Sequence, residues 1–211
     1  MDKEKLRPKL NKWADILEGF IETTKMDNIF KTLKATKGKI LPESKDLFHI
    51  FRQIPKDKIR LLILVDDFNW STLLKSISLE YNLDYNIYYR TNDFNFLYEQ
   101  GIFLLPISLT HEVEKGPISH RDLWKDFIVH FLSKLDSKIP TLLIGEAKEF
   151  EEYSLSRKIW KLDSIKDTKG VFQQINLYLR DEFKLSINYS YKRYQELKDD
   201  YQLLDDNYVI F

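Results

Sequence analysis

Residues 59–65 read Ile-Arg-Leu-Leu-Ile-Leu-Val, an almost unbroken aliphatic run that is followed at once by Asp66-Asp67. Such a run, without alternation of polar residues, is typical of a strand buried on both faces of a parallel sheet. Two shorter apolar runs, Ile102–Leu105 and Thr141–Ile144, repeat the pattern. We also expect a strand over Lys158–Leu162.

Amphipathic helices are expected before and between these strands. Trp13, Ile16, Leu17, Phe20 and Ile21 form one apolar stripe at helical spacing. Further helices are predicted around Leu123–Leu135, after Gly145 and from Gly170 to about Phe183. Strands that alternate with helices predict an α/β fold, a three-layer α/β/α sandwich around a short, mostly parallel central sheet. We expect a single domain over residues 1–211, with residues 190–211 as a C-terminal extension.

The composition excludes several classes of protein. The 211 residues include no cysteine and only four histidines, which excludes disulfide scaffolds, thiolate metal sites and cysteine nucleophiles. There is no Gly-rich phosphate loop and no metal-ligand spacing, so we expect neither metal nor cofactor. No apolar run approaches the roughly 20 residues of a membrane span, and the N-terminus is charged. We therefore expect a monomeric intracellular protein without membrane contact, cytoplasmic or associated with the nucleoid.

Positive charge is concentrated in the first part of the chain. Overall, 33 basic residues balance 33 acidic ones, but residues 1–60 contain 15 Lys and Arg against 9 Asp and Glu. A protein that binds duplex DNA usually carries a basic footprint, because neutralising phosphates supplies much of the affinity. This chain therefore binds DNA only if a local patch does so. A solvated Lys-rich helix face is the alternative.

Four segments, in order, resemble the family 1 uracil-DNA glycosylases over roughly residues 10–190. Gln100–Thr110 (QGIFLLPISLT) resembles the QGVLLLNxxLT segment of that family. Leu142–Ala147 (LLIGEA) resembles its LLWGxxA strand exit. The other two are the approach Leu41-Pro42 to Leu64, and Ser119-His120 followed by Trp124–Phe127 (WKDF). The resemblance implies the three-layer fold, DNA as the partner, and a site at the carboxyl ends of the strands, where open α/β sheets bind ligands.

The active-site motifs depart from the family pattern. Where the family has GQDPYH, this chain has Val65–Trp70 (VDDFNW), in which only Asp67 matches. Asn69 replaces the tyrosine that excludes the methyl group of thymine, and Pro106 replaces the asparagine that hydrogen-bonds uracil. The HPSP loop appears as Leu162–Ile165 (LDSI), without its histidine. We expect Phe68, Asn69, Trp70 and Pro106 to line the base pocket, although Trp70 could equally belong to the core.

The candidate catalytic residues follow from the chemistry of N-glycosidic hydrolysis. The reaction needs a carboxylate near C1′ to orient water and stabilise an oxocarbenium-like transition state, and a group that supports charge on the leaving base. The resemblance gives the first role to Asp67. Its neighbour Asp66 would raise the pKa of one carboxyl if both faced one pocket. His111 is the candidate for leaving-base charge. An Asp pair after a strand can also be only a turn or helix cap.

Four residues are candidates for DNA contact. His120 either keeps a family-like contact or caps the helix that contains Trp124. Ser164, Lys166 and Lys169 occupy the loop that the family inserts into the minor groove, and the two lysines either hold phosphates or are simply solvated.

These residues predict a DNA glycosylase that acts on a flipped-out, modified (5-substituted) pyrimidine rather than on uracil. Loss of a bulky blocking side chain is what a larger base requires, because a pocket rejects an oversized ligand mainly by steric clash. Such bases occur in hypermodified phage DNA, so a role in anti-phage defence is expected. The alternative is an inactive module on the same scaffold that binds DNA or docks a protein partner, such as a polymerase accessory factor.

Overall fold

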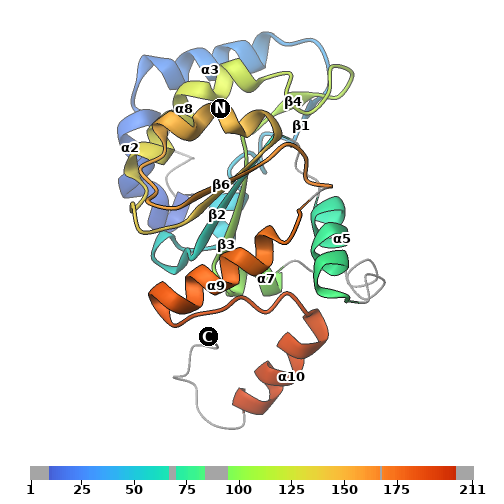
Figure 1. Cartoon of the computed structure of the whole chain (residues 1–211). Helices are drawn as coiled ribbons and strands as arrows, with labels where there is room; N and C mark the ends of the chain where they lie inside the picture. The colour runs from blue at the N-terminus through green and yellow to red at the C-terminus, as the bar shows by residue number, and fades with distance from the viewer. Residues whose placement is uncertain (1–9, 67–69, 84–94, 167, 203–211) are drawn as a thin grey trace.

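The computed structural model describes residues 10–66, 70–83, 95–166 and 168–202, and its centre is a parallel sheet (Figure 1). Within these described residues, the sheet has four strands in the order β3-β2-β5-β6. Its strands are β2 (Leu61–Val65), β3 (Ile102–Pro106), β5 (Thr141–Ile144) and β6 (Ile159–Leu162). Every residue of β2 is buried, as the unbroken aliphatic run predicts, because helices cover both faces.

Helices form a layer on each face of the sheet, so the predicted three-layer sandwich is confirmed (Figure 1). One face packs against η2 (Asn11–Trp13), α2 (Ala14–Ile21), α3 (Thr24–Ala35), α4 (Ile50–Gln53) and α8 (Arg121–Lys134). The other face packs against α5 (Trp70–Tyr81), α7 (Asn95–Glu99), α9 (Val171–Phe183) and α10 (Tyr191–Gln202). Alternate residues of each strand serve the two faces, so Leu62 and Leu64 point to the first and Leu61 and Ile63 to the second.

An aromatic cluster anchors the first face. Trp13 stacks on Phe103 of β3 at 5.2 Å between ring centroids and meets Phe51 edge-on at 5.4 Å. The indole N–H of Trp13 donates to the carbonyl of Ile54 at 2.8 Å, so the buried ring keeps its hydrogen bond. This bond joins residues 41 positions apart in the sequence. It fixes the start of α2 against the segment that leads into β2.

The C-terminal segment packs on the second face through α10. Tyr194 is buried and lies against Phe96 of α7. The N-cap of the neighbouring helix α9 is Gly170, which has a left-handed backbone and no side chain that could cap the helix. Glu80, at the end of α5, supplies the cap instead, because its carboxylate accepts the backbone N–H of Gln173 at 2.7 Å.

Three parts of the fold differ from or add to the sequence expectations. The helix predicted after Gly145 is present, and it is a 3₁₀ helix, η4 (Gly145–Tyr153). A second, two-stranded antiparallel sheet pairs β1 (Ile40–Leu41) with β4 (His111–Glu112). The short 3₁₀ turn η3 (Lys56–Lys58) precedes β2. Among the described helices, none has the length and apolar character to cross a bilayer.

Candidate functional site at the carboxyl edge of the sheet

The carboxyl ends of all four strands lie level with one another. The pairing places Pro106 beside Val65, Val65 beside Ile144 and Ile144 beside Leu162, one row across the sheet. The next residue of each strand therefore leaves the sheet at the same edge. The structure thus brings together the exits that contain Asp66, Pro106, Gly145 and Ser164.

Asp66 is held against the exit of β5. Its Oδ2 accepts the backbone N–H of Glu146 at 3.2 Å. Gly145 has φ +65°, and a Cβ at this position would lie 1.9 Å from the same carboxylate oxygen. Only glycine both adopts this backbone conformation readily and leaves room for Asp66. The carboxylate of Asp66 therefore ties the exit of β2 to the first turn after β5, and its catalytic role stays a prediction.

An ion-pair cluster continues from Glu146 to the start of α8. Arg121 Nη1 lies 2.8 Å from Glu146 Oε2, and Arg121 Nε lies 3.8 Å from Glu149 Oε1. A side-chain hydrogen bond with Asp122, followed by the charge of Glu149, raises the pKa of Arg121. Since Asp66 binds the backbone of Glu146 and Arg121 binds its side chain, Glu146 links the exits of β2 and β5 to the helix.

The loop after β6 carries the predicted phosphate contacts. Ser164 is half-buried and its hydroxyl accepts the backbone N–H of Lys166 at 3.2 Å, which makes a local turn. Lys166 and Lys169 are exposed, and Lys169 has a left-handed backbone with φ +45°. Asp163 pairs with Lys148 of η4, whose hydrogen bond lowers the pKa of the Asp163 carboxyl. The loop is therefore tied to η4 while its two lysines face solvent.

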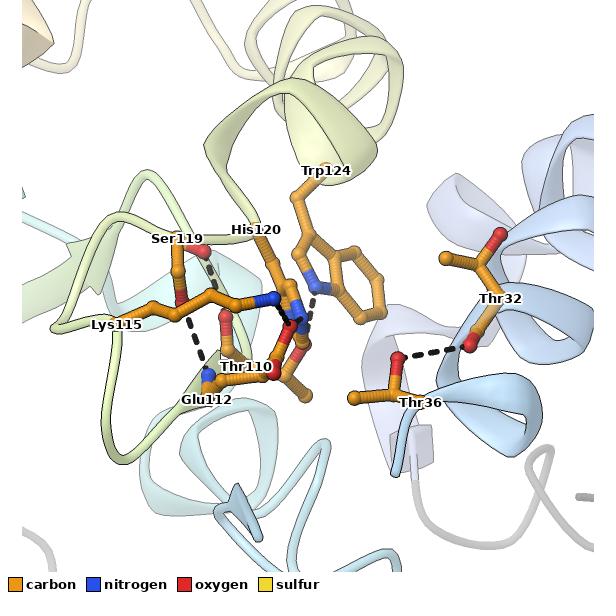
Figure 2. Close-up of polar contacts among 9 residues, drawn as sticks. Thr32, Thr36, Thr110, Glu112, Lys115, Ser119, His120 and Trp124 are labelled. Carbon is orange, nitrogen blue, oxygen red and sulfur yellow. Dashed lines mark hydrogen bonds and ion pairs between the residues drawn. The ribbon is translucent and has the colours of Figure 1, made fainter. Parts of the chain in front are cut away.

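His120 belongs to a separate polar network with Thr110, Glu112 and Trp124 (Figure 2). Thr110 Oγ1 lies 2.9 Å from His120 Nδ1 and accepts the indole N–H of Trp124 at 2.7 Å. The Glu112 carboxylate can only accept and faces His120 Nε2, so it favours a proton on Nε2, and the Thr110 hydroxyl then donates to Nδ1. The proton of the neutral imidazole is then on Nε2, which faces Glu112 Oε1 at 3.6 Å.

Burial sets the charge state of His120. Its side chain is 7% exposed, and desolvation lowers its pKa, an effect that Glu112 partly opposes and that Lys115 and His111 reinforce. His120 occupies the N-cap position of α8, as the capping alternative places it, although its side chain makes no capping hydrogen bond. The buried imidazole joins β4 to α8, and its contact with DNA stays a prediction.

His111 lies on β4 in the short antiparallel sheet. It is half-buried and pairs with Leu41 of β1. No contact described here joins His111 to Asp66 or Pro106. Its role beside the leaving base therefore stays a prediction.

The remaining predicted residues lie outside the described part of the chain. Asp67, Phe68 and Asn69 are among the residues that are not described, and they lie between β2 and α5 in the sequence. Trp70 begins α5, but its side chain is likewise outside the described residues. Within the described residues, no three His, Asp or Glu side chains gather as metal ligands do.

The sequence analysis missed Arg121 and Glu146 as parts of this edge. A signal for Arg121 was available, since a cation in the first turn of a helix opposes the helix dipole unless a carboxylate compensates it. Glu146 stands within the LLIGEA segment, but nothing in the sequence indicates that its N–H meets Asp66 across 80 residues.

The solved structures that resemble this chain include uracil-DNA glycosylases. Mimivirus uracil-DNA glycosylase superposes with a TM-score of 0.67 at 15% identity, over 90% of this chain and 90% of that one. A variant of mimivirus UNG in complex with UGI gives a TM-score of 0.67 at 14% identity, over 90% and 91%. No protein-family model and no curated protein matches the sequence. The chain therefore has a uracil-DNA glycosylase-like fold, and its low identity to these structures fits its altered active-site motifs.

Proposed function

We propose that this protein is a DNA glycosylase that hydrolyses the N-glycosidic bond of a flipped-out, 5-substituted pyrimidine. One observation carries the proposal: the acidic pair that begins with Asp66 leaves central strand β2 at the carboxyl edge of a glycosylase-like sheet. This is the edge at which open α/β sheets bind ligands. In the proposal, Asp67 orients the attacking water and stabilises positive charge that develops at C1′.

The described residues around Asp67 support this assignment. Asp66 is fixed by the N–H of Glu146, so the chain enters the loop of Asp67 from a defined position. Lys166 and Lys169 are exposed on the loop after the outermost strand, where they could contact phosphates on either side of the flipped nucleotide. In this arrangement the Asp67 carboxylate acts at the sugar and the two lysines act at the phosphate backbone.

The substrate class rests on two substitutions in the proposed base pocket. Asn69 stands where the family has the tyrosine that excludes a 5-methyl group, and Pro106 ends β3 without a side-chain donor or acceptor. Both changes reduce selectivity for uracil and favour a larger base. Hypermodified phage DNA contains such bases, for example glucosylated hydroxymethylcytosine, which is the reason to propose a role in defence against phage.

A panel of oligonucleotides tests the proposal. Duplexes and single strands that contain uracil, thymine, hydroxymethylcytosine or glucosylated hydroxymethylcytosine are incubated with the protein and then treated with alkali. Strand breaks at a 5-substituted pyrimidine, lost in Asp67→Asn and kept in the matched surface variant Asp126→Asn, are expected. Cleavage at uracil alone would overturn the proposed substrate class. If no base is released, the proposal that the protein is an enzyme would be overturned.

The second candidate is an inactive module that binds DNA or a protein on the same scaffold. Its support is that the Asp66 carboxylate is already used by the Glu146 N–H, and that Pro106 offers no group for the edge of a base. This candidate predicts retention of DNA or of a protein without base release in the same assay.

A further inference from the structure

A large groove lies at the opposite edge of the sheet from the proposed active site. It has a volume of about 910 Å³ and is lined by the segments that enter β2 and β5 and by the chain that follows α9. Because these segments precede parallel strands or end the helices that run antiparallel to them, the groove belongs to the amino edge. Its volume is at the upper end of the range of ligand sites.

The groove combines an apolar floor with a basic rim. Half-buried or buried apolar side chains form the floor, among them Ile16, Ile59, Ile139, Phe183 and Leu185. The rim carries five cationic side chains against two carboxylates. These are Lys56, Arg60, Lys134, Lys138 and Lys184 against Asp57 and Asp136.

Only part of this positive charge is balanced within the described residues. Lys56 pairs with Asp15 of α2. Asp57 lies 3.9 Å from Lys12, so the charge of one of the two rim carboxylates is balanced by a residue outside the groove lining. Among the residues that the structure describes, the Arg60 guanidinium donates to backbone carbonyls, those of Asp57 at 3.5 Å and Ile59 at 3.4 Å. The rim therefore keeps a positive excess next to an apolar surface.

Helix-end electrostatics explain some of these cations but not all. Lys134 is in the last turn of α8 and Lys184 caps α9, where positive charge compensates the helix dipole. Arg60 and Lys138 are not at the end of any helix. Side chains that repel one another around one groove are stabilised most by an anionic partner that enters it.

We infer that this groove, defined by Arg60, Lys134, Lys138 and the apolar floor, docks an acidic amphipathic segment of a partner protein. Apolar side chains of the segment occupy the floor while its carboxylates meet the rim, as in recognition of amphipathic peptides by grooves. DNA fits less well, because phosphates gain nothing from an apolar floor. The groove also faces away from the carboxyl edge, so the partner and a flipped nucleotide can be bound together.

Fluorescence anisotropy with the full chain tests the inference. The probe is a labelled peptide of Glu and Leu with the Leu residues at helical spacing, and its control replaces each Glu by Gln. The groove variant is Lys134→Glu with Lys138→Glu. The matched control is Lys31→Glu with Lys75→Glu, which makes the same change of charge at exposed positions of α3 and α5 outside the groove lining.

The wild-type chain should bind the Glu peptide at least about tenfold more tightly than the Gln peptide, with the difference shrinking at high salt. The groove variant should lose about tenfold in affinity for the Glu peptide, and the control variant less than about twofold. Unaltered thermal unfolding establishes that each variant is folded.

Absence of peptide binding, or equal binding by both variants, overturns the inference. If binding of a DNA oligonucleotide depends on Lys134 and Lys138 while binding of the peptide does not, the groove would instead be assigned to nucleic acid. Should the groove variant fail to fold, equal affinity of the wild type for the Glu and Gln peptides would still overturn it.

Discussion

Replacing Gly145 by alanine tests the link between the exits of β2 and β5. The methyl group would lie 1.9 Å from Asp66 Oδ2 and 2.5 Å from Asp66 Cγ, so Asp66 must move and its hydrogen bond with the Glu146 N–H is lost. The left-handed backbone at φ +65° costs alanine about 1 kcal/mol. The lost hydrogen bond adds about 1–2 kcal/mol. The free energy of unfolding should therefore fall by about 2–3 kcal/mol.

Urea unfolding followed by circular dichroism measures this change, and two further variants separate its parts. Gly116→Ala is the matched control, because Gly116 has φ +89° and no atom within 4 Å of an added Cβ, so only the backbone cost of about 1 kcal/mol applies. In an Asp66→Ala background, the clash and the hydrogen bond are absent, and Gly145→Ala should also cost about 1 kcal/mol. Equal costs for Gly145→Ala in both backgrounds would refute the proposed contact.

Three other predictions concern buried polar groups. Thr110→Val should lower the free energy of unfolding, measured by urea titration, by about 2–4 kcal/mol, because Trp124 and His120 both lose a buried hydrogen-bond partner. Thr110→Ser keeps the hydroxyl and should lower it by less than half as much. Thr141→Val should raise the unfolding free energy by up to about 1 kcal/mol, since Thr141 Oγ1 is buried and has no hydrogen-bond partner among the described residues; a loss of stability would contradict this. Because the pKa of His120 is lowered from 6.5 in the folded protein, its contribution to stability should be complete above pH 6.5 and decline as the pH falls below 6.5. His120→Gln should flatten the dependence of unfolding free energy on pH in that window, and an unchanged slope would show that another group is responsible.

Much of the fold follows from local sequence patterns. The strand predicted over Thr141–Ile144 has those bounds in the structure, and the run from Ile59 gives β2 from Leu61 onward. Both predictions succeed because a fully buried strand has only one composition that suits two apolar faces. Leu73, Leu74 and Ile77 also carried a helical spacing that indicates α5, which the sequence analysis did not use.

Other features depend on contacts that local patterns do not encode. The β1–β4 pairing joins Ile40 to Glu112 through strands of two residues each, too short for a periodicity signal. The 3₁₀ geometry of η4 accompanies the left-handed Gly145 at its start. At the candidate site, the common edge of the strands was predictable from a parallel sheet, whereas the Arg121–Glu146 pair required the packing of α8 beside η4.

The rate of base release in a single turnover tests the central claim most directly. With the 5-substituted oligonucleotide that the panel identifies and protein in excess, Asp67→Asn should slow release by about 100-fold or more, because one electrostatic group at the reacting centre contributes on that scale. Asp126→Asn, exposed on α8, should leave the rate within about twofold. A rate for Asp67→Asn equal to that of the wild-type protein, with DNA binding intact, would contradict the assignment of this carboxylate to the chemistry.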